Sequence, residues 1–135
     1  MKILVPTDFS ESANQALEYG AEIAKATQSQ LTLLHVYFGQ AQLSSKLDTV
    51  QALAVICQTI SAEYDSIACV PVTRAGEVVD EILAEADDIG ADFIVMGTKG
   101  ATNLGRLVFG SNTASVIEKA KCPVLSVPGT HTFRK

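Results

Sequence analysis

Residues 92–114 read DFIVMGTKGATNLGRLVFGSNTA and combine an apolar run, a glycine-rich loop and the start of a helix. The run from Asp92 to Gly97 lacks polar–apolar alternation, which is typical of a strand that is buried on both faces. Helical spacing of apolar residues begins near Thr113 and continues to Ala120. A buried strand that leads through a loop into a helix is the repeating unit of an α/β fold.

The rest of the chain repeats this unit. Further strand-like runs occupy Lys2 to Pro6, Leu31 to Tyr37, Ile67 to Thr73 and Pro123 to Pro128. Apolar residues at helical spacing predict three more helices, around residues 13–24, 50–60 and 77–86. Strands that alternate with helices pair in parallel and are joined by right-handed crossovers. We therefore expect an α/β fold with a single open, doubly wound parallel sheet of five strands and helices on both faces.

Turn and capping residues support these limits. Asp8 and Glu11 have the spacing of a capping box, which predicts that Asp8 caps the first helix. Gly90 follows the third helix as a C-terminal stop. We expect one domain over residues 1–128, followed by a frayed tail or linker over residues 129–135.

Length and composition exclude several classes of function. A chain of 135 residues fits one domain, and its formal net charge of -5 has the wrong sign for binding a nucleic acid backbone. Charged residues interrupt every apolar run before it reaches the roughly 18 residues of a membrane span. The three cysteines include no C-x-x-C pair, which indicates reduced thiols and no zinc site. We expect a cytoplasmic protein with neither nucleic acid nor membrane as partner.

The loop after residue 97 has the composition of an anion-binding loop. Gly97 and Gly100 would let the backbone turn sharply and approach a ligand without a side chain in the way. Gly110 and Ser111 stand where the helix begins, so they should offer free backbone N–H groups and a hydroxyl at its positive end. The sequence predicts a phosphate site here, and the alternative is that the glycines only form turns.

Two common nucleotide motifs are absent. Gly105 and Gly110 have the spacing of a P-loop, but Ser111 and Asn112 stand where the P-loop has lysine and Ser/Thr. The first strand leads into Pro-Thr-Asp-Phe rather than G-x-G-x-x-G, so a dinucleotide would find no pyrophosphate loop there. The sequence therefore encodes no ordinary P-loop hydrolase, and it disfavours a dinucleotide-dependent dehydrogenase.

Four stretches together resemble the universal stress protein family. They are Ile3-Leu-Val-Pro-Thr-Asp-Phe-Ser10, His35-Val36, Gly97-x2-Gly100-x9-Gly110-Ser111 and Cys122-Pro-Val-Leu-Ser-Val-Pro128. The resemblance covers essentially the whole chain, and the glycine spacing resembles the ATP-binding branch of the family. It implies a Rossmann-like sheet of the adenine nucleotide alpha hydrolase type, with strand order 3-2-1-4-5.

The resemblance also implies a set of nucleotide-binding residues. The set is Pro6, Thr7, Asp8, Val36, Met96, Gly97, Thr98, Lys99, Gly100, Arg106, Gly110, Ser111 and Asn112. The residues up to Gly97 would surround the adenosine, with Val36 meeting the adenine through its backbone. Gly100, Gly110, Ser111 and Asn112 would take the phosphates, with magnesium as a candidate bridge. Lys99 and Arg106 would neutralise phosphate charge, or else form solvated surface.

The function implied by the resemblance is ATP binding by a stress-response or signalling protein, with ADP and AMP left open as ligands. Hydrolysis is expected to be slow at most, because the sequence offers donors but no convincing base beside them, and no catalytic residue is predicted. The strand at residues 124–127 is expected at a sheet edge, where unpaired backbone groups favour association. The resemblance implies that two copies pair through this edge as a homodimer. Two alternatives remain: a small enzyme that acts on an adenylated substrate through Asp8 or His35, and a dimeric interaction module without a nucleotide.

Overall fold

The computed structural model of the chain describes residues 1–37, 43–98 and 110–128. The strands in these residues are β1 (Lys2–Pro6), β2 (Gln30–Tyr37), β3 (Cys69–Ala75), β4 (Phe93–Gly97) and β5 (Val124–Val127). The helices that alternate with them are α1 (Glu11–Thr27), α2 (Leu43–Glu63), α3 (Val78–Ile89) and α4 (Ser111–Lys119). None of these helices is long and apolar enough to cross a membrane.

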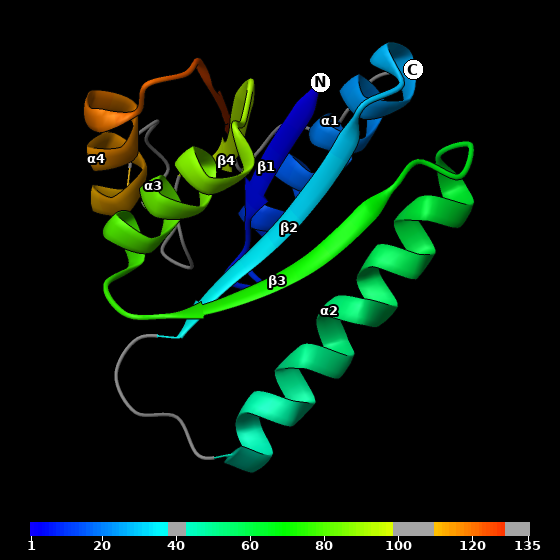
Figure 1. Ribbon diagram of the computed structural model, residues 1–135, viewed down its shortest axis with the longest axis horizontal. Helices are drawn as coiled ribbons and strands as arrows, with labels where there is room; N and C mark the ends of the chain where they lie inside the picture. Colours follow the sequence, from blue (N-terminus) through cyan, green and yellow to red (C-terminus); the bar gives the residue numbers. More distant parts are fainter. Residues whose placement is uncertain (38–42, 99–109, 129–135) are drawn as a thin grey trace.

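The strands form one parallel sheet in the order β3-β2-β1-β4-β5. Apolar side chains of α1 and α2 pack on one face of this sheet, and those of α3 and α4 pack on the other face. Figure 1 shows α3 and α4 together on one side and the long helix α2 beside β3. The predicted fold class, strand order and two-sided helical cover are therefore confirmed.

β1 shows how the sequence specifies this arrangement. Ile3, Leu4 and Val5 are each fully buried, because consecutive side chains of a central strand point to opposite faces that are both covered. Ile3 and Val5 belong to the core under α1 and α2, and Leu4 belongs to the core under α3 and α4. Burying each such side chain contributes about 1.5–3 kcal/mol to stability, so this short apolar run anchors both layers.

The start of α1 differs from the prediction. Ser10 is the N-cap, since its hydroxyl accepts a hydrogen bond from the Ala13 N–H at 3.2 Å. Asp8 lies two residues earlier and accepts a bond from the Ser10 N–H at 2.9 Å. Between them Phe9 has a φ of 65°, a left-handed conformation that a right-handed helix cannot include. The prediction that Asp8 caps the helix was therefore wrong by two residues.

The end of α3 and the start of β3 both depend on residues with a left-handed backbone conformation. Gly90 takes a φ of 64° directly after α3, which confirms the predicted C-terminal stop. The third strand was predicted at residues 67–73, but it spans Cys69–Ala75. Asp65 and Ser66 both have positive φ values and form the turn after α2. Residue 67 still belongs to that turn through a bond from its N–H to the Tyr64 carbonyl, so pairing begins two residues late.

Candidate functional site

A pocket of about 400 Å³ opens at the carboxyl ends of β1 and β4. These two strands are neighbours in the sheet, and the chain leaves them toward opposite faces, to α1 and to α4. Such a switch point leaves a crevice in which open α/β sheets bind their ligands. The described lining residues are Pro6, Thr7, Asp8, Ser10, Ala13, Leu34, His35, Val36, Val78, Ile82, Met96, Gly97, Gly110, Ser111, Asn112 and Thr113.

The structure brings most of the predicted site residues together around this pocket. Nine of the thirteen line it: Pro6, Thr7, Asp8, Val36, Met96, Gly97, Gly110, Ser111 and Asn112. Lys99, Gly100 and Arg106 lie outside the described residues. Thr98 is described but is 2% exposed and absent from the lining. Its N–H donates to the Val127 carbonyl at 2.9 Å, so its backbone joins β4 to β5.

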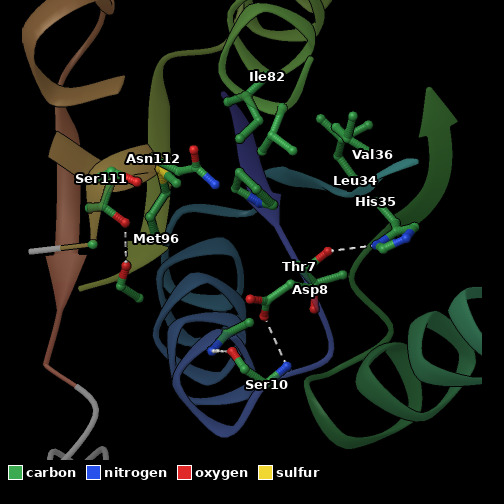
Figure 2. A pocket seen from close by; sticks show the side chains of 16 residues that line it. Thr7, Asp8, Ser10, Leu34, His35, Val36, Ile82, Met96, Ser111 and Asn112 are labelled. Carbon is green, nitrogen blue, oxygen red and sulfur yellow. Dashed lines mark hydrogen bonds between the residues drawn. The ribbon is translucent and has the colours of Figure 1, made fainter. Parts of the chain in front are cut away.

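The first turn of α4 forms one side of the pocket. Ser111 and Asn112 are exposed there, and Figure 2 shows their side chains at the edge of the cavity. The first N–H groups of a helix have no partner within the helix, and the helix dipole makes this end positive. The Thr113 hydroxyl donates to the Gly97 carbonyl at 2.8 Å, which fixes the start of α4 against the end of β4. This side of the pocket is suited to an anion.

The backbone N–H of Gly110 is not free for a ligand, in contrast to the prediction. This N–H was expected to be free for an anion, but it donates to the Thr98 carbonyl. This bond closes the chain back onto the end of β4 immediately before α4 begins. The donors that remain for a ligand are therefore those of the first helical turn, beginning at Ser111.

Gly97 also has a role other than the predicted one. Its φ lies outside the left-handed region, so no sharp turn requires glycine here. A Cβ at this position would come within 2.1 Å of the Ser12 hydroxyl oxygen and 2.8 Å of the Ser12 carbonyl oxygen. Glycine at 97 therefore lets the backbone of α1 approach β4. The predicted sharp turn is wrong for this position, and the role in ligand approach stays a prediction for a residue that does line the pocket.

Thr7 and His35 form the base of the pocket between β1 and β2. The Thr7 N–H donates to the Leu34 carbonyl at 2.8 Å, which continues the pairing of the two strands beyond Pro6. The Nδ1 atom of His35 lies 2.9 Å from the Thr7 carbonyl oxygen. A carbonyl can only accept, so Nδ1 carries a proton and donates it to this bond. The Phe9 ring lies beside the imidazole, with centroids 4.9 Å apart.

The end of the pocket away from Ser111 is apolar. Leu34 and Val36 of β2 and Ile82 of α3 lie there, and Val78 of α3 also lines the pocket. Met96 of β4 lies instead near Ser111 and Asn112 (Figure 2). Figure 2 shows Leu34, Val36 and Ile82 grouped away from Ser111. The sequence did not predict the two α3 residues as part of the site, because helical periodicity indicates an apolar face without showing what that face covers. Their position one helical turn apart on a helix that follows an edge strand was the available signal.

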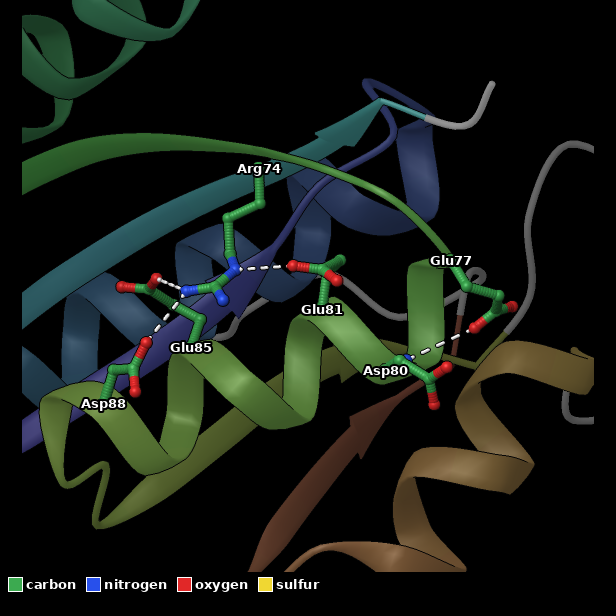
Figure 3. Close-up of polar contacts among 6 residues, drawn as sticks. All are labelled: Arg74, Glu77, Asp80, Glu81, Glu85 and Asp88. Atoms are coloured by element: carbon green, nitrogen blue, oxygen red, sulfur yellow. Dashed lines mark hydrogen bonds and ion pairs between the residues drawn. The ribbon is translucent and has the colours of Figure 1, made fainter. Parts of the chain in front are cut away.

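Arg74 of β3 binds the helix α3, which lines the pocket through Val78 and Ile82. Its guanidinium donates to Glu81 and Glu85, each at 2.9 Å, and to Asp88 at 3.1 Å (Figure 3). These hydrogen bonds raise the pKa of Arg74 above its usual value. The Glu85 side chain is only 8% exposed, so it depends on this partner for a counter-charge.

Replacing Arg74 with methionine is expected to lower the free energy of unfolding by roughly 2 kcal/mol, because the Glu85 carboxylate would stay buried without its cation. Arg74→Lys is the matched control: it keeps the charge but loses the planar fork that reaches several carboxylates at once. Urea denaturation should place the lysine variant between the wild type and Arg74→Met. Equal stability of all three proteins would contradict this role.

The charges around the pocket are unevenly distributed. Asp8 is the one acidic side chain among the described lining residues, which include no lysine or arginine. It is exposed and accepts its hydrogen bond from the backbone through a single carboxylate oxygen, Oδ1. No group of three potential metal ligands occurs among the described residues. A divalent cation here would thus need most of its oxygen ligands from a bound phosphate and from water.

Comparison with known proteins agrees with this architecture. The model of the universal stress protein family matches residues 1–128. The chain is 36% identical over 132 residues to universal stress protein Sll1654 of Synechocystis, covering 93% of this chain and 84% of that protein. A universal stress protein from Archaeoglobus fulgidus, solved in complex with dAMP, matches with a TM-score of 0.75 and 25% identity, covering 93% of this chain and 96% of that one.

A second structure concerns another adenine nucleotide. A universal stress protein solved in complex with cAMP matches with a TM-score of 0.72 and 25% identity, covering 98% of this chain and 98% of that one. The family model spans nearly all of the sequence, and the curated relative exceeds 30% identity over most of its own length. The chain belongs to the universal stress protein family.

Proposed function

We propose that the chain binds ATP together with magnesium in the pocket between β1 and β4. The observation that carries the proposal is the arrangement of apolar, acidic and hydrogen-bond-donating groups along this pocket. An apolar end at Val36 and Ile82 suits a purine base, Asp8 lies between the ends, and the first turn of α4 suits phosphates (Figure 2). The volume of about 400 Å³ lies within the range of small-molecule sites.

The relatives support the ligand class. Structures of two universal stress proteins, both similar over more than nine-tenths of this chain, contain dAMP and cAMP. The choice of ATP rests on the glycine spacing at residues 97, 100 and 110 and on the anion-binding end of α4. Magnesium would reduce the charge of the phosphates, with Asp8 and the Ser111 hydroxyl as the oxygen ligands that the described pocket can add.

We assign the protein to cytoplasmic stress signalling through its nucleotide state, with slow hydrolysis at most. Asp8 accepts from the Ser10 N–H through Oδ1 and His35 donates through Nδ1 to the Thr7 carbonyl, so position decides whether either residue acts as a base. Figure 2 shows His35 on the side of the pocket away from Ser111, where the phosphates would bind. A general base must reach the attacking water beside the phosphate. The position of His35 does not favour it, and Asp8 would instead serve as a ligand of magnesium.

Calorimetric titration of nucleotide-stripped protein tests the proposal. With magnesium present, ATP, ADP, AMP and adenosine should each give saturable heat, and affinity should increase with the number of phosphates. GTP carries the same phosphates on a different base and is the matched control for the apolar end of the pocket. Absence of saturable binding with every adenine ligand would overturn the proposal and favour an interaction module. Rapid ADP release in the same samples would instead favour an enzyme.

We also propose that two copies pair through β5. β5 is an edge strand. On its β4 side, the carbonyl of Pro123, the residue just before the strand, accepts from the Ile94 N–H, and the carbonyl of Val127 accepts from the Thr98 N–H. Because backbone groups alternate in direction along a strand, the N–H of Ser126 faces away from β4. Leu125 is 37% exposed and Ile117 of the adjacent α4 is 42% exposed, which adds apolar surface near this edge. An unpaired edge of this kind favours strand pairing with another chain.

Ser126→Pro should convert the dimer into a monomer without unfolding it. Proline removes the outward N–H and leaves the bonds to β4 in place, and an edge strand tolerates proline at such a position. Ser126→Thr keeps the N–H and is the matched control. Sedimentation velocity at micromolar concentration should give a dimer for the wild type and for Ser126→Thr, and a monomer for Ser126→Pro. A monomeric wild type would contradict the pairing.

A further inference from the structure

Two cysteines from different elements meet on the α2 side of the sheet. Cys57 lies in α2, and Cys69 is the first residue of β3. Their sulfur atoms are 2.8 Å apart, with Cys69 donating to Cys57, although the residues are twelve positions apart in the sequence. A disulfide bond is about 2.05 Å long, so the sulfurs would close by less than about 1 Å to form one.

The pair borders a surface pocket separate from the candidate nucleotide site. This pocket has a volume of about 510 Å³, and its lining includes both cysteines together with Gln58, Ser61 and Pro71. Cys57 itself is 4% exposed, whereas Cys69 is half-buried. A small oxidant can therefore reach the sulfurs from the solvent side, while a large one is hindered at Cys57.

The contact also makes the two thiols chemically unequal. The hydrogen bond from Cys69 lowers the pKa of the Cys57 thiol, against the opposing effect of burial. The same bond, together with burial, raises the pKa of Cys69. The thiolate is the reactive form of cysteine, so Cys57 is the thiol that attacks first and Cys69 is the one that resolves the product.

We propose that Cys57 and Cys69 form a redox-modification site, in which a hydroperoxide converts the two thiols into an intramolecular disulfide. In the first step the Cys57 thiol gives up its proton, the thiolate attacks the peroxide, and its sulfur becomes a sulfenic acid. The O–O bond breaks, and the leaving oxygen takes up a proton to depart as water or an alcohol. In the second step the Cys69 sulfur attacks the Cys57 sulfur and displaces its hydroxyl as water, with the thiol proton of Cys69. With hydrogen peroxide, two thiols and one peroxide give one disulfide and two waters. A dithiol reductant reverses the change.

The third cysteine provides an internal comparison. Cys122 lies in a different pocket, beside Lys121 and Asp87, and no other cysteine lies there. Its pKa is raised, first by burial and then by the charges of Asp87 and Asp92. It lacks both a partner thiol and the lowered pKa of Cys57, so peroxide should leave it reduced while the pair oxidises.

Intact mass spectrometry after peroxide treatment tests the site. The protein is treated with a small excess of hydrogen peroxide, denatured, alkylated and weighed. Untreated protein should take up three alkyl groups, and oxidised protein should take up one, at Cys122. Proteolysis should yield a peptide that links Cys57 to Cys69, and dithiothreitol should restore three alkylation sites. Retention of all three thiols, or linkage only between molecules, would overturn the proposal.

Single variants assign the roles of the two thiols. Cys69→Ser should form no disulfide and should collect sulfenic or sulfinic acid at Cys57, whereas Cys122→Ser should form the disulfide as the wild type does. Oxidation should raise the melting temperature of the wild type by roughly 10 °C, because the bond restrains the unfolded chain without distorting the native contact. A lower melting temperature after oxidation would show that the native fold does not place the sulfurs for bonding. This proposal does not depend on nucleotide binding.

Discussion

Ser111→Glu is expected to lower the affinity for ATP by about 100-fold, which corresponds to about 3 kcal/mol. Ser111 is exposed in the first turn of α4 and lines the candidate site. A carboxylate there would occupy the positive helix end and repel the phosphates, so the charge-assisted hydrogen bonds of this turn would be lost. The binding of adenosine, which carries no phosphate, should change little. Calorimetry with both ligands measures the difference.

Stability separates this effect from a folding defect. A glutamate in the first turn of a helix is favourable by about 0.3–1 kcal/mol, so Ser111→Glu should melt at or above the wild-type temperature. Ala114→Glu is the matched control, since Ala114 is exposed on the same helix but does not line the pocket. That variant should bind ATP nearly as the wild type does. Equal losses in the two variants would mean that overall charge, not the first turn of α4, controls binding.

The fold was largely predictable from the sequence because its signals are local and repeated. The apolar run at residues 2–6 was predicted with the limits of β1, since a strand buried on both faces leaves a continuous apolar run. The strand order, which the structure confirms, could not be predicted from such local signals. Periodicity cannot tell which strands are neighbours, and the order came from the family resemblance.

The predictions that failed depend on backbone conformation and long-range contact. The capping residue was misplaced because nothing in the sequence indicated the left-handed φ of Phe9. Gly110 was expected to donate to a ligand, but its N–H bonds to Thr98, which lies twelve residues earlier. The α3 residues of the pocket were missed for a similar reason, since only the packed structure shows Val78 and Ile82 facing β2 and β4.

Gly97→Ala is expected to be the most destabilising single methyl addition among the described glycines, at about 3 kcal/mol or roughly 10 °C in melting temperature. The added Cβ would meet the Ser12 hydroxyl oxygen at 2.1 Å and the Ser12 backbone at 2.8 and 2.9 Å. A side chain can rotate away, but the backbone of α1 cannot move without disturbing the residues that it buries against the sheet, such as Ala16 and Leu17. Thermal and urea denaturation measure the loss.

A double variant tests whether the backbone contact dominates. The Ser12 hydroxyl has no hydrogen-bond partner among the described residues, so Ser12→Ala alone should cost little. Combined with Gly97→Ala, it removes the 2.1 Å contact and leaves the contacts with the Ser12 carbonyl group, so only part of the stability should return. Gly90→Ala is the control for adding a methyl group into open space, and it should cost about 1 kcal/mol through its left-handed φ alone. Full recovery in the double variant would mean that the side chain of Ser12, and not the approach of α1, requires glycine at position 97.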